Sequence, residues 1–198
     1  MLVSDAHKFL FLEVPKTASS SMKEELLRYA DETQSAEFSK HVTANKLCTE
    51  LGPQYLQRYT SFAFVREPYS WLYSWYSYRQ RDNLQDGTHP FHERHTRGKT
   101  FDQFVDTVLD DEVFLRQSDF ICTRGGKTLV DYVGRYENLD SDFKGICEKL
   151  NLATGVLATR NASQGNGFSP DMVNSANRRT INRYFHADFE IFGYEKIF

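Results

Sequence analysis

Residues 9–22 read FLFLEVPKTASSSM, and this stretch decides the expected fold. Its apolar run predicts a buried strand over residues 9–14, and the amphipathic residues that follow predict a helix over residues 20–31. Between them lies a short polar loop that holds Lys16 and several hydroxyl side chains. A helix N-terminus presents unpaired N–H groups and the positive end of the helix dipole, and a lysine adds positive charge. The stretch therefore predicts an anion site near Lys16.

Two other interpretations of this loop need weighing. A Walker A loop requires the pattern G-x-x-x-x-G-K-[ST], and the chain has no glycine before Gly52. An ordinary strand–helix turn, in which a serine caps the helix and the lysine is exposed, stays open at this point.

The composition is that of a folded protein, and the length predicts one domain over residues 1–198. Hydrophobic residues make up 40% of the chain and aromatic residues 15%, which excludes a disordered protein. The net charge of −3 argues against a nucleic-acid partner. No apolar run approaches the roughly 20 residues of a membrane span, and the first residues lack the pattern of a secretory signal.

The three cysteines, Cys48, Cys122 and Cys147, are widely spaced. Their spacing predicts neither a metal site nor a disulfide framework. Unpaired cysteines are typical of a reducing compartment, so we expect a cytoplasmic protein, although a trimmed lumenal domain would look similar.

Strand and helix signals alternate along the chain. Further strands are expected over residues 59–65 and 129–136, and further helices over residues 43–51, 69–79, 101–109, 141–150 and 174–185. Ser141 or Asp140 is expected to cap the helix over 141–150. Polar loops are expected over residues 81–99 and 161–170. This alternation predicts an α/β fold with a mostly parallel central sheet flanked by helices, in which ligands bind at the carboxyl ends of the strands.

A second segment, FAFVREPYSWLYSWY at residues 62–76, has the same organisation as the first. A buried strand delivers Arg66 at its carboxyl end, and Ser74 lies about two helical turns into the next helix. Arg66 can bind a phosphate with two N–H groups, while Ser74 donates a further hydrogen bond. The alternative is an arginine paired with a carboxylate, for which Glu67 is the nearest candidate.

Together, VPKTASSS at residues 14–21 and FVREPYSWLYSWY at residues 64–76 resemble the pair of nucleotide-binding segments of sulfotransferases. The similarity is closest to the carbohydrate-type branch, which includes the heparan-sulfate 2-O-sulfotransferases and their bacterial relatives. Further stretches agree in order, so that the resemblance covers most of the chain: FSKHVTANKL, FLRQSDFI, VDYVGRYENLDSDFKGICEKLNL and RYFHADFEIFGY. The order and spacing of these motifs along the chain make the match specific.

The resemblance implies a P-loop-NTPase-like sulfotransferase fold and transfer of the sulfuryl group of 3′-phosphoadenylyl sulfate (PAPS) to an acceptor hydroxyl, with no metal. One segment would hold the 5′-phosphosulfate, where Lys16 would stabilise the leaving oxygen, and the other the 3′-phosphate. The residues implied to bind the cofactor are Lys16, Thr17, Ala18, Ser19, Ser20, Ser21, Arg66, Ser74 and Arg160.

The acceptor hydroxyl must lose a proton, and histidine suits that step at neutral pH. Among the six histidines, the resemblance implies His41 as the base, because it stands in SKHVTA where related sulfotransferases carry theirs. The alternative is a histidine that only precedes or caps a helix.

The second segment departs from the family pattern R-N-P-x-x-R-L-x-S-x-Y at two positions. Glu67 replaces the asparagine and Trp71 replaces the second arginine. A carboxylate near the 3′-phosphate would lower the local positive potential, unless it points away or pairs with a cation.

The loop over residues 81–99 carries His89, His92 and His95 together with several basic residues. Its HERH sequence is not the zinc motif HExxH, so we expect no metal there. The loop is either a solvated surface segment or a rim that binds an anionic acceptor through Arg94 and Arg97.

Three functional interpretations follow from the sequence. The favoured one is a PAPS-dependent O-sulfotransferase whose acceptor is a saccharide or a small molecule. The others are a P-loop-like phosphotransferase and a nucleotide-binding module without turnover. The sequence predicts no oligomeric state.

Overall fold

The computed structural model describes residues 1–31, 38–89, 92–109, 114–153, 157 and 167–198. The chain divides into two compact units. The first unit comprises Met1–Arg66 and Arg116–Asn161, and the second comprises Glu67–Leu115 and Ala162–Phe198.

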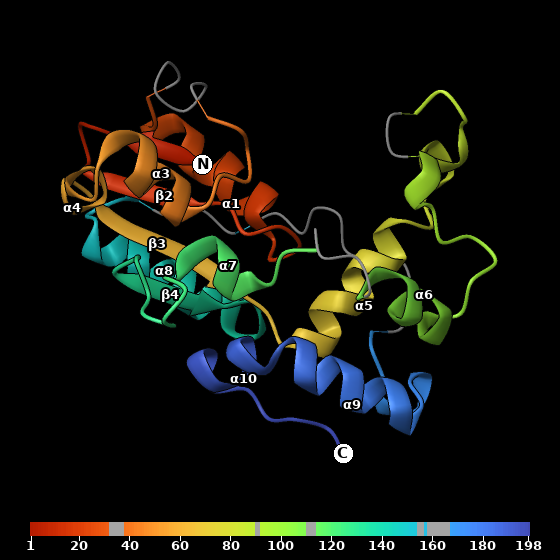
Figure 1. Cartoon of the computed structure of the whole chain (residues 1–198). Helices are drawn as coiled ribbons and strands as arrows, with labels where there is room; N and C mark the ends of the chain where they lie inside the picture. The colour runs from red at the N-terminus through yellow and green to blue at the C-terminus, as the bar shows by residue number, and fades with distance from the viewer. Residues whose placement is uncertain (32–37, 90–91, 110–113, 154–156, 158–166) are drawn as a thin grey trace. The chain divides into compact units, whose positions relative to one another are not determined.

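A four-stranded sheet with the order β1-β2-β3-β4 forms the centre of the first unit (Figure 1). The strands are β1 (Leu2–Ser4), β2 (Phe9–Leu12), β3 (Thr60–Val65) and β4 (Tyr132–Arg135). Strand β1 runs antiparallel to β2, whereas β2, β3 and β4 are parallel to one another. All of β2 and nearly all of β3 is buried, as expected for strands with helices on both faces.

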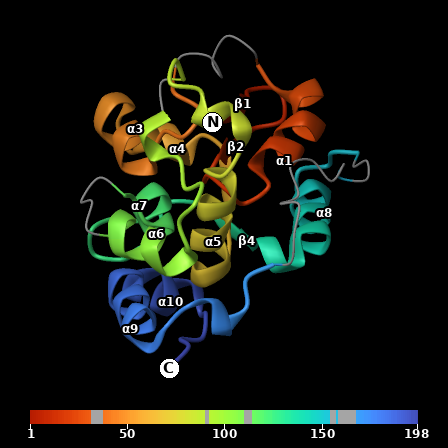
Figure 2. The same ribbon diagram turned by 90° about the vertical axis from the view of Figure 1, so that its right-hand side faces the viewer.

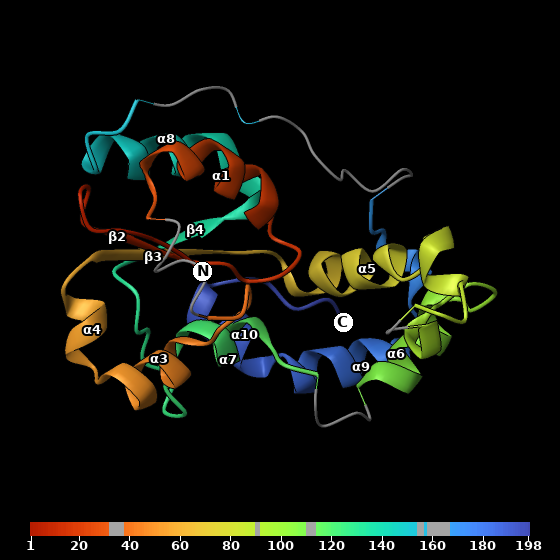
Figure 3. The ribbon, with the colours of Figure 1, turned by 90° about the horizontal axis from the view of Figure 1, so that it is seen from above.

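Helices cover both faces of this sheet. Figure 3 shows α1 (Ser19–Leu26) and α8 (Leu139–Lys149) on one face, and α3 (Ala44–Leu51), α4 (Gln54–Gln57) and α7 (Gln117–Ile121) on the other. Phe11 and Phe62 stack on neighbouring strands with ring centroids 5.0 Å apart, and Met22 of α1 and Phe143 of α8 join them in one buried cluster. The predicted α/β class with a mostly parallel sheet is confirmed.

The second unit consists of helices. They are α5 (Pro68–Tyr78), α6 (Phe101–Val108), α9 (Ser175–Tyr184) and α10 (His186–Phe192), and α5, α6 and α9 lie side by side in Figures 1 and 2. Its core is aromatic, with the ring of Trp71 5.9 Å from that of Phe185 and 5.6 Å from that of Phe114. Among the described residues, no helix is long and apolar enough to cross a bilayer.

Most predicted elements are present, with ends shifted by a few residues. Thr43 and Asn174 cap α3 and α9 through their side chains, which fixes two predicted helix starts. The strand predicted over 129–136 is shorter, at Tyr132–Arg135. Just before it, the backbone N–H of Asp131 donates to the carbonyl of Ser61 at 2.9 Å, while the Asp131 carboxylate accepts the N–H of Ser61 at 2.8 Å.

The predicted cap of α8 is wrong. The helix begins at Leu139 after Asn138, with no side-chain cap among the residues that the structure describes. The Ser141 hydroxyl donates instead to the carbonyl of Asn138 at 2.9 Å, and Asp140 lies inside the first turn. Part of the loop predicted over 161–170 lies outside the described residues, which resume at 167.

Candidate anion-binding site

The loop between β2 and α1 has a backbone shaped to present N–H groups. Lys16 and Ala18 both adopt positive φ, at 66° and 61°, a conformation that costs a residue other than glycine about 1–3 kcal/mol and gathers at functional sites. Alternation of left-handed and ordinary residues turns successive N–H groups toward one side, as in anion-binding nests. The Thr17 hydroxyl is buried and donates to the carbonyl of Val14 at 2.9 Å, so it holds the loop in this shape.

The N-terminus of α1 is open to an anion. Its N-cap is Ala18, and among the described residues no side chain caps the helix and no acidic residue stands in its first turn. The interpretation that a serine caps this helix is therefore wrong. The N–H of Ser21 donates to the carbonyl of Ala18 at 3.0 Å, so the backbone donors for a ligand precede Ser21.

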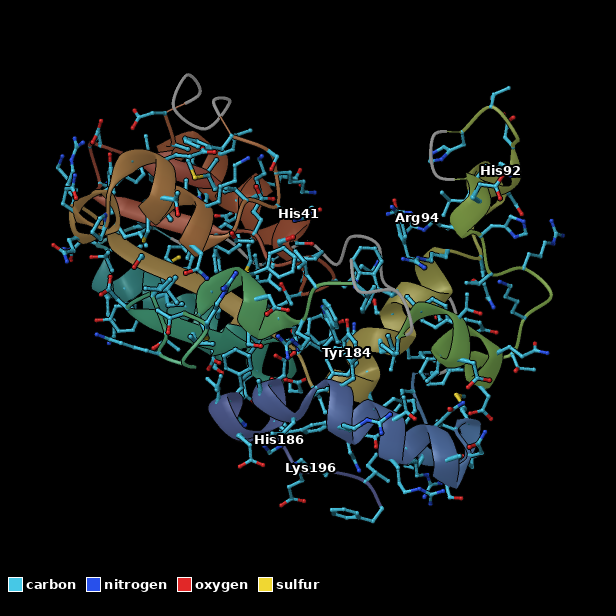
Figure 4. All side chains as sticks on the ribbon, in the orientation of Figure 1. His41, His92, Arg94, Tyr184, His186 and Lys196 are labelled. Carbon is cyan, nitrogen blue, oxygen red and sulfur yellow. The ribbon has the colours of Figure 1, made fainter. Side chains whose placement is uncertain are left out.

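The side chains of Lys40 and His41, two residues that lie shortly before α3, contact the β2–α1 loop and the first turn of α1. The Nδ1 atom of His41 lies 2.7 Å from the carbonyl oxygen of Glu13, and the Nζ atom of Lys40 donates to Ser20 Oγ at 3.1 Å. The structure thus places His41 against the start of the loop that carries Lys16, although the two residues are 25 positions apart, the difference of 41 and 16. Figure 4 shows His41 on the segment that precedes α3.

The bond to Glu13 determines the tautomer of His41. A carbonyl oxygen can only accept, so Nδ1 carries the proton and Nε2 holds the lone pair of the neutral ring. His41 is exposed to solvent. The protein that surrounds part of its ring nevertheless desolvates the imidazolium and lowers the pKa of His41. The carbonyl of Glu13 opposes this shift and the charge of Lys40 adds to it. Neutral His41, with Nε2 available as a base, is therefore the main form at pH 7.

Lys40 and Glu13 are features of the site that the sequence argument missed. Lys40 adds a second positive charge at the N-terminus of α1, and its place next to His41 in SKHVTA was the available signal. The Glu13 carboxylate is buried and its Oε1 lies 3.3 Å from Nζ of Lys23, an ion pair that ties β2 to α1.

Arg66 stands directly after β3, at the same edge of the sheet as the Lys16 loop. Strands β2 and β3 are parallel, with Leu12 paired to Ala63, so both chains leave the sheet in the same direction. This is the edge at which ligands bind in open α/β sheets.

The second unit contains Ser74 together with Glu67 and Trp71, the two residues that depart from the pattern R-N-P-x-x-R-L-x-S-x-Y. Ser74 is buried on α5. The Glu67 carboxylate caps α5, with Oε1 accepting from the N–H of Tyr69 at 3.0 Å and Oε2 from the N–H of Ser70 at 2.7 Å. The N-terminus of α5 is thereby occupied by a carboxylate. Trp71 belongs to the aromatic core.

The loop over residues 81–99 is anchored to α5 at its far end. Thr96 is buried, and its hydroxyl donates to the carbonyl of Tyr76 at 2.9 Å while its N–H donates to that of Arg79 at 3.0 Å. Figure 4 shows His92 and Arg94 on this loop. Within the described part of the chain, no group of three or more His, Cys, Asp or Glu residues is arranged to hold a metal ion. Arg160 lies outside the described residues.

Comparison with known proteins agrees with this arrangement. The family model described as "Sulfotransferase family" matches residues 1–195. Neither the curated proteins nor the solved structures give a significant match. A match over nearly the whole chain, together with a mostly parallel α/β sheet, identifies the chain as a member of the sulfotransferase family.

Proposed function

We propose that this sulfotransferase uses PAPS as donor and transfers its sulfuryl group to an acceptor hydroxyl, with His41 as the base. The observation that supports this most is the contact of His41 with the β2–α1 loop, because it brings a neutral imidazole to an anion site. The uncapped N-terminus of α1, with Lys16 and Lys40 beside it, suits a phosphosulfate group.

Charge stabilisation is the main task assigned to the loop. In the transfer, the bond from sulfur to the bridging oxygen of the 5′-phosphate breaks, and a bond from sulfur to the acceptor oxygen forms. Negative charge grows on the bridging oxygen, and the Lys16 ammonium and the backbone N–H groups before Ser21 would stabilise it. The acceptor proton passes to Nε2 of His41. The other product is 3′-phosphoadenosine 5′-phosphate (PAP).

Arg66 and Ser74 are the residues we assign to the 3′-phosphate. Because Glu67 occupies the N-terminus of α5, recognition of this phosphate would rest on the Arg66 side chain and the Ser74 hydroxyl rather than on helix N–H groups. We also infer that the two units work as one domain over residues 1–198, which is supported by a single family match that spans both.

The acceptor is proposed to be a saccharide, on the resemblance to the carbohydrate-type branch. Exposed basic residues on the 81–99 loop, Arg94 and Arg97, suit an acidic one. The cytoplasmic location expected from the free cysteines stays a prediction.

A transfer assay tests the proposal. Sulfur-labelled PAPS would be incubated with the protein and a panel of glycans and small alcohols, and the same panel would be run with Lys16→Ala and His41→Ala. Labelled product from the wild type, strongly reduced in both variants, is the expected result. Transfer from ATP instead would favour a phosphotransferase, and PAP binding without transfer to any acceptor would favour a module without turnover.

A further inference from the structure

Arg66 lies just beyond the last residue pair of the β3–β4 ladder. The last pair of the β3–β4 ladder joins Val65 to Arg135, so Arg66 is the first residue beyond it. A side chain at the free end of a strand usually samples several rotamers, and a binding arginine there loses this freedom on binding. Beyond the end of the ladder, two side chains of the first unit contact Arg66 and restrain it.

Gln117 fixes the backbone of Arg66. Its Oε1 accepts from the N–H of Arg66 at 2.7 Å, and its Nε2 donates to the carbonyl of Arg66 at 2.7 Å. Both polar groups of one peptide position are therefore bound by one side-chain amide, in the way that a neighbouring strand would bind them. Gln117 is fully buried at the first position of α7.

The start of α7 is itself secured, which makes Gln117 a rigid anchor. The carboxylate of Asp119 accepts from the backbone N–H of Arg116 at 2.8 Å, and it also pairs with the Arg116 guanidinium at 2.8 Å. The position of Gln117 is thus determined by a local cap.

Tyr136 restrains the other end of Arg66. The guanidinium carbon lies 4.1 Å from the centroid of the Tyr136 ring, within the range of a cation–π contact. The register explains this contact, because Tyr136 follows Arg135 as Arg66 follows Val65 on the paired strand. An aromatic face holds a guanidinium without neutralising its charge, as a carboxylate would.

We propose that Gln117 and Tyr136 are positioning residues that hold Arg66 ready for the 3′-phosphate and thereby set the preference for a 3′-phosphorylated nucleotide. This inference rests on the proposed function, since it takes Arg66 as the 3′-phosphate ligand. Because the pair acts before binding, its loss would weaken the affinity for PAP and spare the affinity for adenosine 5′-phosphate (AMP), which has no 3′-phosphate.

Calorimetric binding of PAP and AMP to a set of variants tests this proposal. Arg66→Ala sets the reference for complete loss of the 3′-phosphate contact. Tyr136→Leu and Gln117→Met should each lower the PAP-to-AMP affinity ratio about tenfold, the effect of a well-placed cation–π or charge-orienting contact. Tyr136→Phe should keep the ratio within about twofold, because the aromatic face remains.

Tyr132→Leu is the matched control. Tyr132 lies on β4 and its ring centroid is 4.1 Å from Nζ of Lys149, so this variant removes an equivalent cation–π contact that does not involve Arg66. The ratio should not change. The double variant Arg66→Ala/Tyr136→Leu should equal Arg66→Ala alone, because Tyr136 acts through Arg66.

The inference is overturned if Tyr136→Leu lowers the affinities for PAP and AMP by the same factor. It is also overturned if the PAP-to-AMP affinity ratio of the double variant is lower than that of Arg66→Ala. Melting curves followed by circular dichroism show whether each variant folds. If Gln117→Met does not fold, the test rests on Tyr136→Leu, because Tyr136 is only half-buried. If Arg66→Ala itself leaves the ratio unchanged, the assignment of the 3′-phosphate site fails instead.

Discussion

Removing the side chain of His41 should affect activity far more than stability. In His41→Ala, the structure loses one hydrogen bond, from Nδ1 to the carbonyl of Glu13 at 2.7 Å, on an exposed residue. Such a bond contributes about 0.5–1.5 kcal/mol to the free energy of unfolding. A general base contributes about 10²- to 10⁴-fold to the rate, which corresponds to about 3 to 5 kcal/mol of activation free energy.

The pH dependence follows from the lowered pKa of His41. Because desolvation, with the charge of Lys40, holds this pKa below its usual value of 6.5, the neutral base prevails at pH 7. The rate should therefore stay level as the pH falls toward 6.5 and decline only as the pH passes through the lowered pKa. With His41→Ala, this acidic limb should disappear from the residual activity.

Steady-state transfer from PAPS between pH 5 and 8, combined with urea unfolding, measures both effects. His186→Ala is the control, since His186 is also exposed and its Nδ1 lies 3.1 Å from Nζ of Lys196 in the second unit (Figure 4). It should keep its activity. A His41→Ala enzyme that folds and turns over within a few-fold of wild type would refute the assignment of His41 as the base.

Three further outcomes are expected. Gly134→Ala should lower the free energy of unfolding in urea by about 1–3 kcal/mol, because its Cβ would lie 2.4 Å from the buried ring of Phe64; an unchanged midpoint would contradict this packing. Glu67→Ala should lower thermal stability by about 1 kcal/mol through loss of the α5 cap, while calorimetry shows no loss of PAP affinity; weaker PAP binding would place the carboxylate in the site. Arg94→Ala with Arg97→Ala should raise the KM for an acidic acceptor and leave that for PAPS unchanged, so an equal rise in both constants would argue against an acceptor rim.

The two central strands of the sheet, β2 and β3, were predictable because they are largely apolar and buried. Residues 9–12 and 60–65 are buried almost throughout, so their hydrophobicity alone marks them, and the turns that follow carry Pro15 and Pro68. Strand β1 and the short helices α4, α7 and α10 were missed, since three to seven residues give too little periodicity to read.

The candidate site was only partly predictable. Lys16 and His41 could be named from motifs, but the place of His41 beside the loop depends on its 2.7 Å contact with the backbone carbonyl of Glu13. A contact with a backbone carbonyl requires no particular side chain at the partner position, so no sequence pattern indicates it. The role of Glu67 was equally hidden, because a glutamate before a proline fits a helix cap as well as a partner for Arg66. Gln117 is 51 positions from Arg66 and meets it through the fold alone.

The central claim is that the Lys16 loop binds the phosphosulfate end of a 3′-phosphorylated nucleotide. Calorimetric titration of PAP into the wild-type protein and Lys16→Ala tests it most directly. We predict saturable binding to the wild type and at least about tenfold weaker binding to the variant, the effect of losing a charge-assisted contact. Equal affinity of the two proteins for PAP would contradict the account.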